Sequence, residues 1–217
     1  MDSLGEALAY DAMDHRAVNQ QFVADLLAAG LEQLGAAGDE PVMLLDLGTG
    51  TAQIPIVLCE RQPAVRVVAV DLAGSMLDLA RGKIEIALLS DRIRLDRVDA
   101  KTLPYDDGQF DCVISNSLIH HLPEPAVALA EMLRVLRSDG LLFVRDLLRP
   151  VTGGQLDELV QTYAGDESRE QQALLAASLH AALRVEELRA LLAPLGVPVE
   201  SVQPTSDRHW TCVHRKV

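Results

Sequence analysis

The stretch LLDLGTGTA at residues 44–52 decides the fold of this chain of 217 residues. It completes a continuous apolar run, residues 42–47, of the kind that forms a buried strand. Gly48 and Gly50 then turn the chain toward a predicted helix at residues 52–60. Glycines at such a turn let the backbone approach a ligand closely, and the helix that follows supplies free N–H groups. The stretch therefore predicts a ligand site at the end of the first strand of an α/β sheet.

The rest of the chain alternates short apolar runs with amphipathic stretches, which predicts strand–helix–strand units and a mostly parallel sheet. We expect one helix over residues 7–34 and, after the first strand, further strands at residues 65–70, 93–98, 110–115 and 141–145. Two closing strands at residues 199–202 and 210–213 are expected to form an antiparallel hairpin. The predicted fold class is a single Rossmann-like α/β domain over residues 1–217, with a seven-stranded, mostly parallel sheet and helices on both faces.

Composition excludes several classes of partner. The formal net charge is −13, and no stripe of Lys or Arg interrupts this acidic balance, so we expect no nucleic-acid substrate. No apolar stretch approaches the roughly 20 residues that span a bilayer, and the N-terminus has no features of a secretory signal, so we expect no membrane partner. Three widely spaced cysteines suit free thiols in a reducing compartment, which predicts a cytoplasmic protein.

Acidic and polar residues follow the other predicted strands. Asp71 ends the second strand, where a carboxylate can accept hydrogen bonds from both hydroxyls of a ribose. Asp99 follows the third strand, and Asn116 lies at the end of the fourth, the end that faces the ligand crevice of an open sheet. A dinucleotide site would require glycine at position 53, where this chain has Gln53, so a pyrophosphate is disfavoured.

Taken together, these elements resemble the class I S-adenosylmethionine (SAM) dependent methyltransferases, in particular the small-molecule branch that includes the ubiquinone/menaquinone-biosynthesis type. The stretch at residues 44–52 is similar to the first motif of that family, and the others are VDLAGSML at 70–77, VDA at 98–100, FDCV at 110–113 and RVLRSDGLL at 134–142. The resemblance covers roughly residues 40–147. Ala52 and the Ser138-Asp139 pair depart from the usual glycine and Pro-Gly residues, which affects loop shape rather than chemistry.

The resemblance implies a cofactor, SAM, with S-adenosylhomocysteine (SAH) as its product, and a set of contacts to it. Gly48 and Gly50 would border the methionine part, and Asp71 would bind the ribose. Asn116 would offer its backbone carbonyl to the methionine ammonium. The full predicted cofactor set is Asp46, Gly48, Thr49, Gly50, Asp71, Leu72, Met76, Asp99, Ala100 and Asn116, of which Leu72, Met76, Asp99 and Ala100 would surround the adenine.

Candidates on the acceptor side lie beyond the fourth and fifth strands. His120 is the predicted general base, although a histidine that only bonds locally is the alternative. The other predicted substrate contacts are Tyr10, His121, Arg145 and Tyr163. For Arg145, a structural ion pair is an equally good interpretation. Residues 1–38 would form an N-terminal helical lid and residues 150–182 a cap over the acceptor, and we predict no metal.

The predicted function is in-line transfer of a methyl group from SAM to a small-molecule acceptor. The sequence leaves two alternative functions open: a catalytically silent SAM-fold partner subunit, and an NAD-dependent oxidoreductase. A homodimer through the 150–182 segment or the closing hairpin is compatible with the sequence, which does not decide the oligomeric state.

Overall fold

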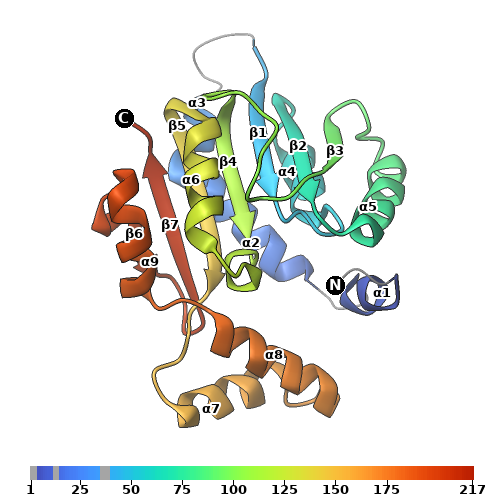
Figure 1. Cartoon of the computed structure of the whole chain (residues 1–217). Coiled ribbons are helices and arrows are strands. Elements are labelled where there is room, and N and C mark those ends of the chain that lie inside the picture. The colour runs from blue at the N-terminus through green and yellow to red at the C-terminus, as the bar shows by residue number, and fades with distance from the viewer. Residues whose placement is uncertain (1–3, 12–14, 35–39) are drawn as a thin grey trace.

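The computed structural model describes residues 4–11, 15–34 and 40–217. One seven-stranded sheet runs through its centre (Figure 1), formed by β1 (Val42–Leu47), β2 (Val65–Asp71), β3 (Ile93–Arg97), β4 (Phe110–Asn116), β5 (Leu136–Leu147), β6 (Val202–Pro204) and β7 (His209–Arg215). The strand order is β3-β2-β1-β4-β5-β7-β6. β1 to β5 pair in parallel, whereas β7 is antiparallel to both β5 and β6. The predicted Rossmann-like fold is confirmed.

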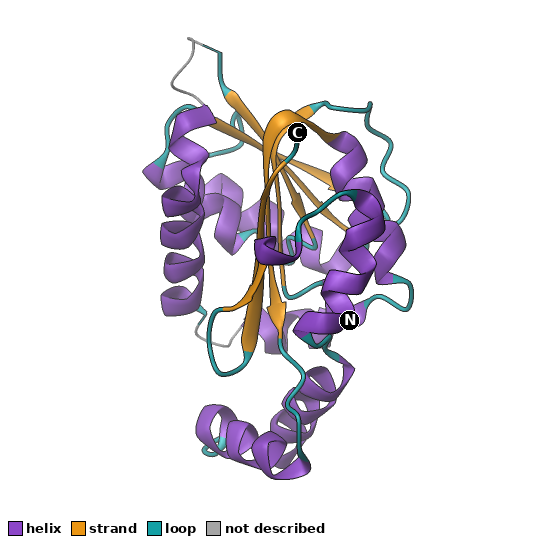
Figure 2. Ribbon diagram, turned by 90° about the vertical axis from the view of Figure 1, so that its left-hand side faces the viewer, coloured by secondary structure: helices purple, strands orange, loops and turns teal. Residues whose placement is uncertain are grey.

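Helices cover both faces of the sheet (Figure 2). Since side chains alternate across a strand, Leu44 packs on one face and Leu45 on the other. One face is covered by α2 (Arg16–Leu26), α4 (Gln53–Arg61) and α5 (Gly74–Ile86), and the opposite face by α6 (Pro125–Val135) and α9 (Val185–Leu192). Both cores are built from fully buried aliphatic and aromatic side chains, so the strands are held rigidly and their carboxyl ends form a fixed platform.

Two helices extend beyond that platform. α7 (Gly153–Ala164) and α8 (Arg169–Ala181) form an antiparallel hairpin at the end of the sheet where β4 and β5 finish (Figure 1). Thr152 and Ser168 cap their N-termini by accepting hydrogen bonds from backbone N–H groups three residues on, as Ser and Thr do at such positions. α8 packs against the short helical turn η2 (Ile119–His121), which carries both predicted acceptor-side histidines.

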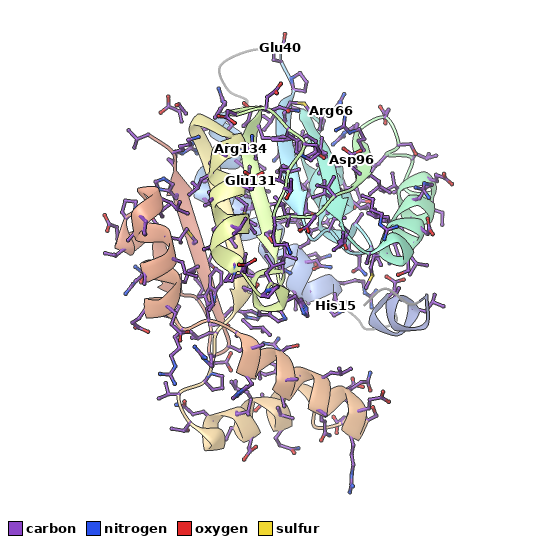
Figure 3. The ribbon with its side chains drawn as sticks, viewed as in Figure 1. His15, Glu40, Arg66, Asp96, Glu131 and Arg134 are labelled. Carbon is purple, nitrogen blue, oxygen red and sulfur yellow. The ribbon has the colours of Figure 1, made fainter. Side chains whose placement is uncertain are left out.

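A polar network fixes the loop between β3 and β4, which carries Asp99. The Arg134 guanidinium donates to the carbonyl oxygens of Tyr105 and Leu103 at 2.8 and 3.0 Å, and pairs with Glu131 one turn earlier on α6. At the β3 side the Tyr105 hydroxyl donates to Asp96 at 2.8 Å. Figure 3 labels Glu131, Arg134 and Asp96 on these two supporting elements. The middle of the loop is therefore attached to both α6 and β3.

Some predicted element boundaries were wrong. In place of one helix over residues 7–34, the described part of this segment contains α1 (Leu4–Asp11), α2, a π-helical turn η1 (Leu27–Leu31) and α3 (Glu32–Leu34). Gly30 breaks the helix with a φ of 107°. Residues 199–201 form a 3₁₀ turn, so the strand of the hairpin starts only at Val202. None of the helices in the described ranges combines the length and apolar character that crossing a bilayer requires.

Candidate active site

The carboxyl ends of the parallel strands gather the predicted ligand contacts at one edge. The strand order reverses between β1 and β4, and open α/β sheets bind their ligands outside the strand ends at such a switch point. The glycine turn follows β1, Asp71 ends β2, Asp99 follows β3 and Asn116 ends β4. The structure thus brings together four segments that are separated in the sequence.

The glycine turn is tied to the neighbouring strand through its backbone. Gly48 N–H and Thr49 N–H both donate to the carbonyl oxygen of Val70, at 2.9 and 3.0 Å. Gly48 has a φ of 73°, and a Cβ at this position would lie 3.0 Å from Leu118. Gly50 has a φ of 55°, but a Cβ there would meet open space. The turn therefore requires glycine at the first position for packing, and at the second it exposes bare backbone to a ligand.

Asp71 joins the turn to the end of β2. One oxygen of its carboxylate accepts from Gly50 N–H and the other from Ala73 N–H, both at 2.9 Å. A carboxylate has about four acceptor positions, so two backbone bonds fix its orientation and leave capacity for hydroxyl donors. Asp71 is therefore oriented before a ligand arrives.

Asp46 lies beneath the same turn and is 2 % exposed. Burial raises the pKa of its carboxyl to about 7, and the negative charge of Asp71 adds to the rise. The carboxyl groups of Asp46 and Asp71 lie close together and, when ionised, produce a negative electrostatic potential at this point of the site. Such a potential favours a cationic ligand over an anionic one.

The predicted adenine contacts differ in exposure. Met76 and Ala100 are buried at 3 % and 9 % exposure, whereas Leu72 is 59 % exposed at the rim. The Asp99 carboxylate accepts from Lys101 N–H at 2.9 Å, which holds it at the start of the loop. An apolar floor with a single oriented carboxylate suits a planar heterocycle with an amino group. Contact with an adenine stays a prediction for all four residues.

His120 and Asp146 form a pair at the ends of β4 and β5. His120 Nδ1 lies 2.5 Å from Asp146 Oδ1, and the two side chains are only 5 % and 1 % exposed. The His121 ring contacts that of His120 in a tilted arrangement, with 4.0 Å between centroids and 40° between the ring planes. Burial lowers the pKa of His121, and the neighbouring His120 lowers it further. Among the described residues, no group of three or more His, Cys, Asp and Glu side chains is placed to hold a metal ion.

Arg145 points to the opposite face of the sheet from Asp146. Its guanidinium donates to Asp25 on α2 at 2.7 Å and to Thr211 on β7 at 2.9 Å. It also lies 5.7 and 5.5 Å from the ring centroids of Phe22 and Phe143. The structural ion pair is thus the interpretation that these contacts favour for Arg145, and a substrate contact remains only a prediction.

We expect Arg145→Met to destabilise the fold by about 2 kcal/mol in urea unfolding, because it removes the hydrogen bonds to Asp25 and Thr211 and a cation that lies over two rings. The control is Arg81→Met, whose guanidinium pairs with Asp78 on an exposed helix surface, where such pairs contribute about 0.5 kcal/mol. An unchanged free energy of unfolding in Arg145→Met would show that the ion pair does not fasten α2, and would leave the guanidinium for a substrate.

Tyr163 lies near the C-terminal end of α7, and both its hydroxyl and its ring already have partners within the chain. Its hydroxyl donates to the Asp207 carboxylate, whose two oxygens lie 2.9 and 2.7 Å away, and the Arg208 guanidinium lies 3.5 Å from its ring centroid. Tyr163 therefore joins α7 to the loop between β6 and β7, and a substrate contact of Tyr163 stays a prediction. Tyr10 lies in α1, but its side chain is outside the described residues.

One cluster of site residues was not foreseen from the sequence. The Asp11 carboxylate at the end of α1 accepts from Thr51, from Gln53 and from Lys83 on α5. Burial opposes its ionisation, but the hydrogen bonds from Lys83 and Thr51 bring the pKa of Asp11 below its usual value. Gln53 also accepts from Asn19 on α2 at 3.0 Å. The residue that disfavours a dinucleotide thus helps fasten the opening helices beside the glycine turn.

Comparison with known proteins supports the resemblance to methyltransferases that the sequence motifs indicate. Residues 45–144 match a family model described as a methyltransferase domain. Over this segment, just under half of its length, the chain is similar to methyltransferase domains. The matched region begins in β1 and ends in β5, so it contains the glycine turn, Asp71, Asp99 and His120.

Relatives and solved structures cover different amounts of the chain. A demethylmenaquinone methyltransferase of Deinococcus radiodurans is 39 % identical over 118 residues, which are 54 % of this chain and 48 % of that protein. A malonyl-[acyl-carrier protein] O-methyltransferase of Geobacter sulfurreducens is 38 % identical over 136 residues, 62 % of this chain and 47 % of that protein. The chain thus spans about half the length of these curated relatives.

Two solved structures share the fold over nearly the whole chain. A SAM-dependent methyltransferase from Aquifex aeolicus has a TM-score of 0.72 at 18 % identity and covers 97 % of both chains. The plantazolicin methyltransferase BpumL, in complex with SAH, also has a TM-score of 0.72, at 15 % identity, covering 94 % of this chain and 87 % of that one. At these identities the likeness shows that the methyltransferase domain and its flanking helices adopt a known fold.

Proposed function

We propose that this chain binds SAM at the carboxyl edge of its sheet and catalyses transfer of the methyl group to a small-molecule acceptor. The observation that carries the proposal is the Asp71 carboxylate, which is held by two backbone N–H groups directly beside the exposed backbone of Gly50. When bound, SAM supplies a methyl group on a positively charged sulfur. The residues at the site suit this ligand because Asp46 and Asp71 provide a negative potential.

Each residue of the proposed site would have one role in holding the ligand or the acceptor. Asp71 binds the ribose hydroxyls, Asp99 the adenine amino group and the Asn116 carbonyl the ammonium, while Met76 and Ala100 form an apolar floor. Once donor and acceptor are held in line, placement alone supplies most of the rate, since the donor is already activated. His120 at η2 is the general base for an acceptor that carries a proton.

The segments outside residues 45–144 are the candidates for selecting the acceptor. Two relatives of similar identity to this chain, 39 % and 38 %, are named for different acceptors, a demethylmenaquinone and a malonyl group on a carrier protein. The hairpin α7–α8 packs against η2 and therefore lies beside the proposed base. We assign acceptor selection to this cap and to the N-terminal lid, and place the protein in the cytoplasm because Cys59, Cys112 and Cys212 are buried free thiols. The homodimer stays a prediction.

Isothermal titration calorimetry with SAM, SAH and NAD tests the proposal on the unmodified chain. We expect both adenosyl ligands to bind with micromolar or better affinity and NAD to give no heat, because Gln53 and the Asp11 cluster occupy the helix start that a pyrophosphate would need. Binding of NAD without SAH would overturn the assignment. Binding of neither ligand at millimolar concentration would favour a silent partner subunit.

A further inference from the structure

The carboxylate of Asp146 is surrounded by hydrogen-bond donors. Its Oδ2 accepts from Ile119 N–H at 2.5 Å and from His120 N–H at 3.3 Å, and its Oδ1 accepts from Leu147 N–H at 2.6 Å. The fourth group in contact is His120 Nδ1, at 2.5 Å from Oδ1. Because an ionised carboxylate only accepts hydrogen bonds, Nδ1 must be the donor in this contact.

This contact fixes the state of the other ring nitrogen. In a neutral imidazole only one nitrogen carries hydrogen, so a protonated Nδ1 leaves Nε2 with a free lone pair. Within residues 4–11, 15–34 and 40–217, Nε2 has no hydrogen-bond partner, and it is not among the side-chain atoms that are sealed from solvent. His120 belongs to η2, which follows β4 and packs against α8. Nε2 is therefore the open position of a ring that is otherwise held fast.

The groups around this ring do not compete for the same role. His121, whose ring is tilted against that of His120, has a lowered pKa because it is buried and lies beside His120. His209 on β7 is also buried, and this burial, with Arg208 and Arg145 nearby, lowers its pKa to about 4. The titratable side chain near the C-terminal end of α8, His180, is exposed. Asp146 is thus the carboxylate in direct contact with His120, whereas Asp71 acts on His121 only through its charge.

We propose that Asp146 is a positioning residue that holds His120 in the Nδ1–H tautomer, so that Nε2 takes a proton from the acceptor. This inference rests on the proposed function and deepens it, because it defines the acceptor as a group that must lose a proton, such as a hydroxyl or an activated C–H. The acceptor atom forms its bond to the methyl carbon while the C–S bond breaks and its electron pair stays on sulfur. The acceptor proton moves to Nε2, and the positive charge of the sulfonium is replaced by that of the imidazolium, which Asp146 stabilises.

The structural alternative is that Asp146 only caps the turn η2 through its backbone bonds. Asp146→Asn separates the two roles, since asparagine has the same shape and keeps one oxygen for the backbone N–H groups. Its NH₂ group, however, is a donor and would face Nδ1. The ring would then have to carry its hydrogen on Nε2, which removes the lone pair from the open position. If Asp146 only capped η2, the substitution would not move the ring hydrogen of His120 from Nδ1 to Nε2.

The test is the nitrogen NMR spectrum of the histidine rings in the ¹⁵N-labelled full-length chain near pH 8, with His120 assigned by its absence in His120→Asn. We expect Nδ1–H with a bare Nε2 in the unmodified chain and the reverse in Asp146→Asn. SAH affinity, measured by calorimetry, should be unchanged. The matched control is Asp139→Asn at the opposite edge of the sheet, where φ is 61° and asparagine is well tolerated. Its His120 tautomer should be that of the unmodified chain.

Each outcome decides a different point. An Nε2–H tautomer in the unmodified chain overturns the inference without any variant, and so does an Asp146→Asn protein that folds and keeps Nδ1–H. A loss of SAH affinity beyond about tenfold in Asp146→Asn would also overturn it, because Asp146 would then shape the cofactor site. If the unmodified chain shows the expected tautomer but binds no SAH, the positioning role stands and the proposed function fails.

Discussion

Replacing Asp71 with alanine is expected to remove nearly all of the thermal stabilisation that SAH gives this chain. A ligand bound only by the native state stabilises it by about 2.7 kcal/mol when present at 100 times its dissociation constant. Loss of a carboxylate that fixes the Gly50 turn and would bond both ribose hydroxyls should weaken binding about 100-fold. At the same SAH concentration the variant would then gain only about 0.4 kcal/mol. For a chain of this size the midpoint shift falls from roughly 5–10 °C to 1–2 °C.

The comparison must be made within each protein, with and without SAH. Asp71→Ala also frees the N–H groups of Gly50 and Ala73, so the ligand-free variant should itself be less stable by about 1–2 kcal/mol. Asp78→Ala is the matched control, because Asp78 is an exposed carboxylate on α5 that pairs only with Arg81. Its SAH shift should equal that of the unmodified chain. If SAH raises the unfolding midpoint of Asp71→Ala as much as that of the unmodified chain, Asp71 does not bind the ligand. The assignment of the SAM site would then be wrong.

The sheet and the cofactor edge could be predicted from the sequence because their determinants are local. The apolar run before Gly48 and the acid after the second strand each occur within a few residues, and strand–helix alternation admits few topologies. Helix boundaries were less predictable. Gly30 breaks the opening segment by adopting a positive φ, and the periodicity of the flanking apolar residues does not reveal it.

The pairs that shape the acceptor side could not be predicted because they join distant segments. Asp146 and His120 are 26 residues apart, and their contact depends on the register of β4 against β5, which places Asn116 opposite Arg145. The only sequence cue was an acid within the apolar fifth strand, where a buried carboxylate requires partners. For Arg145 the sequence left two interpretations, and the position of α2 on the opposite face favours the ion pair with Asp25.

The largest expected effect on stability comes from Asp46→Asn. Because the pKa of Asp46 is raised to about 7 in the folded chain from an ordinary value of 3.8, the folded state binds the proton more tightly than the unfolded state does. Stability contributed by this proton is complete below about pH 4 and is lost as pH rises toward 7. Three pKa units correspond to about 4 kcal/mol, an upper figure for the cost of the buried charge at pH 8.

Asparagine keeps the shape of the side chain but does not ionise, so Asp46→Asn should be more stable than the unmodified chain at pH 8, by up to about 4 kcal/mol, and nearly equal to it at pH 4. Urea unfolding at intervals between these two pH values measures the difference. The difference cancels the contributions of His121 and His209, which are present in both proteins. Equal stabilities at pH 8 would show that Asp46 ionises in the folded chain without cost.

A carboxylate that destabilises the fold at neutral pH needs a functional reason, and its place beneath the glycine turn offers one. With Asp71 it produces a negative potential where the cationic part of SAM would lie. Asp46→Asn should therefore weaken SAM binding more than SAH binding, because only SAM carries the sulfonium charge. Calorimetry with both ligands at pH 8 gives the two ratios directly. Equal weakening for SAM and SAH would mean that Asp46 acts on the shape of the turn and not through its charge.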